Sequence, residues 1–99
     1  MEKEQIINKL RENKGVLEGT FYISRIGLFG SYSTDTFQED SDVDLLYELK
    51  GGKRLGFKEV SSLENYIKDL LNVEKVDLVN QKYVNPIIED EIKKTVIYV

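Results

Sequence analysis

The sequence predicts a mixed α+β domain in which a small mixed β-sheet is flanked by helices, in the order α-β-α-β-α-β-α. Two patterns support this fold class. Apolar residues recur at helical spacing in some segments, and short runs rich in β-branched and aromatic residues lie between those segments. The chain has 99 residues, 40% of them hydrophobic, so we expect a single domain over residues 1–99.

The first half of the chain predicts a helix and a strand. We expect the helix from about Lys3 to Leu17, because its apolar residues fall on one face, and we expect it to stop near Gly19. The run from Phe21 to Phe29 has the composition of a strand. This strand ends at Gly30, where a helix or a loop follows.

The second half of the chain also predicts strands and helices in turn. A strand is expected from Ser41 to Leu49, a helix from Phe57 to about Asn72, and a strand from Val73 to Val79. Asn85 and Pro86 resemble the N-cap and first turn of a last helix. The residues expected on the buried side of that helix are Ile88, Ile92 and Val96.

The composition excludes several kinds of site and partner. The chain has no histidine and no cysteine, so imidazole and thiolate chemistry are absent. Its net charge of −4 argues against direct nucleic-acid binding, because such affinity comes largely from lysine and arginine. No apolar run approaches the roughly 20 residues that span a bilayer, and no signal peptide is visible. We therefore expect a cytoplasmic protein without a membrane segment.

Three aspartates in the predicted strands are candidate metal ligands. Side chains alternate across a strand, so Asp42 and Asp44 should point to one face, about 7 Å apart along the backbone. Two like charges so placed repel unless a cation lies between them, and carboxylate oxygens suit Mg²⁺. Asp77 is a lone acid in the next apolar strand and is the expected third ligand, which could also accept a proton.

The Gly30-Ser31 turn is the candidate phosphate site. Glycine lets backbone amides come close to an anion, and the serine hydroxyl adds a donor. Together with two Mg²⁺ ions on the carboxylates, this turn could hold a nucleoside triphosphate. An EF-hand calcium loop does not fit Asp40-x-Asp42-x-Asp44, because Leu45 stands where the loop needs glycine.

The strings Leu28-Phe29-Gly30-Ser31-Tyr32, Ser-Asp-Val-Asp-Leu-Leu and Val-Asp-Leu-Val resemble the minimal nucleotidyltransferase (MNT) group of the DNA polymerase β-like superfamily. The resemblance covers nearly the whole chain. It implies the nucleotidyltransferase fold, two Mg²⁺ ions and transfer of a nucleoside monophosphate, AMP when the substrate is ATP. It makes Gly30 and Ser31 triphosphate contacts, Asp42 and Asp44 ligands of both metals, and Asp77 the third acid.

The resemblance also implies a partner. Many family members are antitoxins of HEPN-domain ribonucleases, and some adenylylate a tyrosine of that toxin, so we expect a HEPN toxin as acceptor and a homo- or hetero-oligomer. The alternative is a non-catalytic antitoxin that neutralises the toxin by complex formation. One departure favours this alternative: where the family usually has Ala-Arg-Gly, the chain has Ser33, Thr34 and Asp35. Lys53 and Arg54 are the candidates to replace the missing cation.

Overall fold

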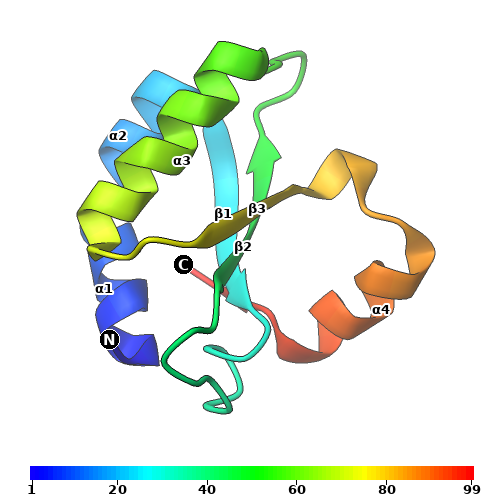
Figure 1. Ribbon diagram of the computed structural model, residues 1–99. Coiled ribbons are helices and arrows are strands. Elements are labelled where there is room, and N and C mark those ends of the chain that lie inside the picture. Colours follow the sequence, from blue (N-terminus) through cyan, green and yellow to red (C-terminus); the bar gives the residue numbers. More distant parts are fainter.

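The computed structural model describes residues 1–99 as four helices and one four-stranded sheet (Figure 1). The helices are α1 (Lys3–Glu12), α2 (Lys14–Phe21), α3 (Phe57–Leu71) and α4 (Pro86–Thr95), with the 3-10 turn η1 (Gln81–Tyr83) before α4. The strands are β1 (Ile23–Phe29), β2 (Val43–Leu49), β3 (Val76–Asn80) and β4 (Ile97–Tyr98). Their order in the sheet is β3-β2-β1-β4, and only the β2/β3 pair is parallel.

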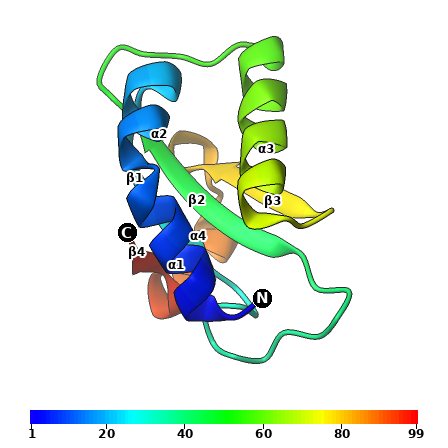
Figure 2. The same cartoon turned by 90° about the vertical axis from the view of Figure 1, so that its left-hand side faces the viewer.

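Helices cover the two faces of the sheet unequally. Figures 1 and 2 show α1, α2 and α3 on one face and α4 on the other. The first face carries the main core of 15 buried residues, to which alternate residues of β2 such as Val43 and Leu45 contribute. The second face has a small core of only three buried residues, Phe29, Leu46 and Ile92. The α4 face is therefore the thinly covered side of the sheet.

The expected first helix is in fact two helices. The chain bends at Asn13, where φ is −110° and ψ is 16°, and α2 then continues through Gly15 and Gly19. Two side-chain hydrogen bonds hold the bend: Asn13 donates to the Lys9 carbonyl (2.8 Å), and the Tyr66 hydroxyl donates to Asn13 Oδ1 (3.0 Å). Because the Tyr66 contact comes from α3, helical periodicity alone could not show the break.

The connection between β1 and β2 is a series of turns over residues 31–35, so the helix or loop expected there is a loop. The Asn85 cap is confirmed, since its side chain accepts a hydrogen bond from the Ile88 amide at 3.0 Å. The burial expected for Ile88 is wrong: it is 42% exposed, because α4 contributes only Ile92 to the small core.

Strand β4 was not expected, because two residues are too short to show a period. It pairs with β1 at Gly27 and Leu28. A methyl group on Gly27 would lie 2.7 Å from Val96 Cγ2, so glycine lets the end of the chain approach β1. None of the helices has the length and apolar character that crossing a membrane requires.

Candidate active site

The sheet places two of the three predicted aspartates side by side. In the parallel β2/β3 pair, Asp44 is directly opposite Asp77. Both alternate with residues of the main core, so they lie on the face that α4 covers thinly. Asp42 immediately precedes β2, two residues before Asp44. Asp44 is half-buried, whereas Asp42 and Asp77 are exposed.

Asp44 carries the electrostatic strain of this group. Burial, and after it the neighbouring charges of Asp77, Asp42 and Glu91, together raise its pKa from 3.8 to about 6. A cation would relieve this repulsion, and a donor set made only of carboxylate oxygens suits Mg²⁺. The donor chemistry therefore fits a hard cation. The side chains are not, however, drawn together into a set of three that could share one ion.

Sequence reasoning missed Glu91 as a neighbour of this group. In the structure, Glu89 and Asp90 form i,i+4 ion pairs with Lys93 and Lys94. Glu91 has Thr95 at i+4 and no ion pair, and its charge acts on Asp44. The missing partner at i+4 was the signal in the sequence that could have set Glu91 apart.

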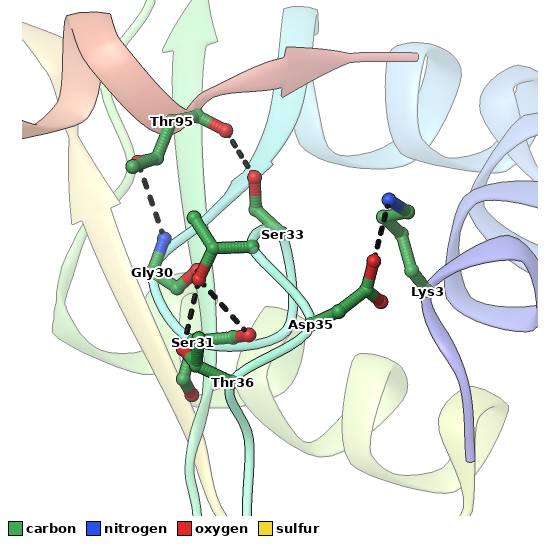
Figure 3. A network of polar contacts seen from close by, with 8 residues as sticks. Lys3, Gly30, Ser31, Ser33, Asp35, Thr36 and Thr95 are labelled. Atoms are coloured by element: carbon green, nitrogen blue, oxygen red, sulfur yellow. Dashed lines mark hydrogen bonds and ion pairs between the residues drawn. The ribbon is translucent and has the colours of Figure 1, made fainter.

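The turn after β1 touches the same carboxylate. Gly30 has φ of +76°, and a methyl group there would overlap Asp44 Oδ2, so both the backbone and the contact require glycine. The Gly30 amide donates to Thr95 Oγ1 at 3.4 Å, and the Ser33 hydroxyl donates to the Thr95 carbonyl (Figure 3). The end of α4 is thus hydrogen-bonded to this turn. The Ser31 hydroxyl, next to Gly30 in the chain, takes part in none of the protein's side-chain hydrogen bonds and is free to donate.

The structure explains the departure at Thr34 and Asp35. Asp35 has φ of +59°, the left-handed conformation that glycine adopts most readily, which accounts for glycine being usual there in the resembling family. The Asp35 carboxylate pairs with Lys3 Nζ at 3.1 Å and points away from Ser31 (Figure 3). Thr34 Oγ1 makes contacts only within the turn. The added carboxylate is therefore neutralised, but no cation takes the place of the arginine.

Lys53 and Arg54 do not supply that missing charge. They follow the opposite end of β2, and the six residue-to-residue steps from Asp44 to Lys50 span about 20 Å of extended chain. Lys53 Nζ lies over the Tyr22 ring, 4.5 Å from its centroid. These two cations line the largest cavity of the molecule, about 610 Å³, and none of the three aspartates lines it. The expectation that this loop reaches the Gly30-Ser31 turn is wrong.

The raised pKa of Asp44 predicts how the metal-free protein responds to pH. Between pH 4 and 6 the folded state binds more protons than the unfolded state, so stability falls as pH rises through this range. Above pH 6 the cost of the charged carboxylate, from burial first and from the neighbouring acids second, is fully present, at about 1 kcal/mol once solvent screening of a half-buried group is included. We therefore expect Asp44→Asn to be more stable than wild type at pH 7 and equal to it near pH 4.

Urea unfolding in a chelator at the two pH values measures this difference. A variant less stable than wild type at pH 7 would show that Asp44 is a structural hydrogen-bonding group instead.

Comparison with known proteins agrees with this geometry. The family description of the nucleotidyltransferase domain matches residues 3–99. The protein adenylyltransferase MntA of Thermococcus cleftensis is 34% identical over 102 residues, covering 97% of this chain and 94% of that relative.

Two solved structures share the fold. One, described as a minimal nucleotidyltransferase, has a TM-score of 0.76 at 27% identity and covers 98% of this chain and 95% of its own, which confirms the expected fold. The other is a tri-AMPylated HEPN toxin of Shewanella oneidensis in complex with an MNT antitoxin; its TM-score is 0.59 at 22% identity, covering 97% of this chain and 66% of that one. With the family match over nearly its whole length, the chain belongs to the nucleotidyltransferase domain family, as its Gly-Ser turn and paired aspartates predicted.

Proposed function

We propose that the protein is a Mg²⁺-dependent adenylyltransferase that transfers AMP from ATP to a tyrosine hydroxyl of a HEPN-domain toxin. The observation that carries the proposal is the placement of Asp44 opposite Asp77, two residues from Asp42 and in contact with Gly30. The name of the MntA relative and the AMPylated toxin in the Shewanella oneidensis complex support the transferred group and the partner.

Each residue of the site has its own role in the proposed transfer of AMP. When bound, Mg²⁺ would neutralise the triphosphate and the pyrophosphate that leaves. Asp42, Asp44 and Asp77 would hold the metal, and Gly30 leaves room for the Asp44 carboxylate. Ser31 Oγ is free to donate to a phosphate oxygen. The acceptor oxygen bonds to the α-phosphorus, the bond from that phosphorus to the β-bridging oxygen breaks, and Asp77 accepts the hydroxyl proton.

The exposure of the site indicates which molecule carries the acceptor hydroxyl. Asp42 and Asp77 are exposed, and α4 covers the sheet face with a single buried residue, Ile92. This open face leaves the three aspartates accessible to a hydroxyl on another protein. We therefore place the acceptor on the toxin chain, which makes a hetero-oligomer with the toxin part of this proposal.

A second candidate function is a non-catalytic antitoxin that blocks the toxin by binding alone. The turn between β1 and β2 favours it, because Thr34 stands at the position of the usual arginine and the nearby Lys3 is already paired with Asp35. The Gly30 amide is also already bonded to Thr95. The paired Asp44 and Asp77, with Asp42 two residues away, favour the enzyme, since a surface that only binds has no need of these neighbouring acids.

Mg²⁺ and ATP together should stabilise the protein against thermal unfolding, while either alone should do less. The stabilisation is about 2.7 kcal/mol when free ligand exceeds Kd by about 100-fold. Asp42→Asn and Asp44→Asn should each remove the Mg²⁺-dependent part. A calorimetric titration that shows no Mg²⁺-dependent nucleotide binding at millimolar concentrations would rule out the triphosphate site and leave the binding function.

A further inference from the structure

The largest cavity lies between the loop after β2 and the turn η1, at the opposite end of β2 from Asp44. Its volume is about 610 Å³, within the range of roughly 300–1,000 Å³ found for small-molecule sites. The charged residues that line it are Glu48, Lys50, Lys53, Arg54 and Lys82. Four cations against one carboxylate give this cavity a positive charge on a chain whose net charge is −4.

Most of this positive charge is not neutralised within the protein. The one acid, Glu48, is paired with Arg25 outside the lining. Lys50 pairs with Glu18 at 3.3 Å. None of the protein's ion pairs uses the remaining three cations, which are Lys53, Arg54 and Lys82. An anion entering the cavity would therefore meet cations that have no competing carboxylate.

The other lining groups match the parts of a nucleotide beyond its phosphates. Tyr83 is 72% exposed, and Lys82 Nζ lies 5.8 Å from the centroid of the Tyr83 ring. Asn80 Oδ1 accepts a hydrogen bond from the Lys82 amide at 3.0 Å, which fixes η1, and the Gln81 side chain, another amide, belongs to the same lining. An exposed aromatic ring can stack on any base, and amide groups can bond base edges.

We propose that this cavity is a second nucleotide site, which binds di- or triphosphate through Arg54, Lys53 and Lys82 without a metal ion and places the base against Tyr83. It differs from the carboxylate site in one decisive property. Aspartates repel phosphate unless a divalent cation lies between them, whereas lysine and arginine bind phosphate directly. The inference does not depend on the transferase function, because no residue of the cavity belongs to the carboxylate site.

The test is a titration of isotope-labelled protein with ATP or with pyrophosphate in EDTA, followed by amide chemical shifts. We expect saturable shifts at Gly51 and Gln81, and the same shifts in Asp44→Asn. Arg54→Ala with Lys82→Ala should weaken binding of both ligands by at least about tenfold. Lys9→Ala is the matched control, because Lys9 is an exposed cation on α1 and forms no ion pair; this variant should bind like wild type.

Comparison of the two ligands separates the phosphate contacts from the base contact. If Tyr83 stacks on the base, ATP should bind more tightly than pyrophosphate, and Tyr83→Ala should remove that difference. Equal affinities would overturn the base contact. Absence of metal-free binding at millimolar ligand, or full binding by the double variant, would overturn the site, and Mg²⁺-dependent shifts at Gly30 and Ser31 would still report on the transferase site separately.

Discussion

Asp44→Asn should lower AMP transfer by more than about 100-fold while the protein remains folded. Changes outside the direct ligands of a metal commonly cost 10- to 100-fold, and loss of a ligand should cost more. Asp44 is the carboxylate that contacts Gly30, lies opposite Asp77 and has its pKa raised to about 6. Removing its charge leaves only the exposed Asp42 and Asp77 to hold Mg²⁺. Transfer of labelled AMP to the toxin at fixed Mg²⁺ and ATP measures the loss.

Asp69→Asn is the control for this experiment. Asp69 is an exposed aspartate on α3 that forms no ion pair, so its amide variant changes net charge equally without touching the site. We expect it to transfer AMP like wild type. Equal activity of Asp44→Asn and Asp69→Asn would show that Asp44 is not a metal ligand.

Gly30→Ala should damage both stability and Mg²⁺-dependent ATP binding. Its φ of +76° is strained for any residue with a side chain, by about 1–2 kcal/mol. In addition, the new methyl group would overlap Asp44 Oδ2, and the carboxylate would have to move. We therefore expect a loss of stability greater than the backbone strain alone, together with loss of Mg²⁺-dependent nucleotide binding.

Gly52→Ala isolates the backbone contribution to stability. Gly52 has φ of +80°, nearly the same as Gly30, and a methyl group there would have no neighbour within 4 Å. Urea unfolding of both variants should show a larger loss for Gly30→Ala. Equal losses would mean that the Asp44 carboxylate moves aside freely and that Gly30 does not restrict its position.

The parts of the site that local patterns encode could be predicted from the sequence. Alternation along a strand predicts the face on which Asp44 lies, and an acid in the next apolar run predicts a partner for it. Nothing in the sequence gives the register, however, and it is the register that places Asp77 opposite Asp44. The Asn85-Pro86 cap also depends only on neighbouring residues, and it is confirmed by the hydrogen bond from the Ile88 amide to Asn85.

What could not be predicted depends on contacts between distant segments. The Gly30–Thr95 hydrogen bond joins residues 65 positions apart, and the bend at Asn13 is held by Tyr66 from α3. Asp35 looks like an unwanted charge beside the phosphate turn until the fold brings Lys3 next to it. The sequence does not determine where the loop that carries Lys53 and Arg54 lies, so it allows these cations near Ser31. The extended length of β2 excludes that placement.

The intact mass of a HEPN toxin after incubation with this protein, Mg²⁺ and ATP decides between the enzyme and the binding antitoxin. If Asp42, Asp44 and Asp77 act as proposed, the toxin should gain one or more AMP masses, Asp42→Asn combined with Asp44→Asn should abolish the gain, and modified toxin should stay inactive after the two chains are separated. A toxin that keeps its unmodified mass, yet is neutralised equally by wild type and by the double variant, would contradict the transferase proposal.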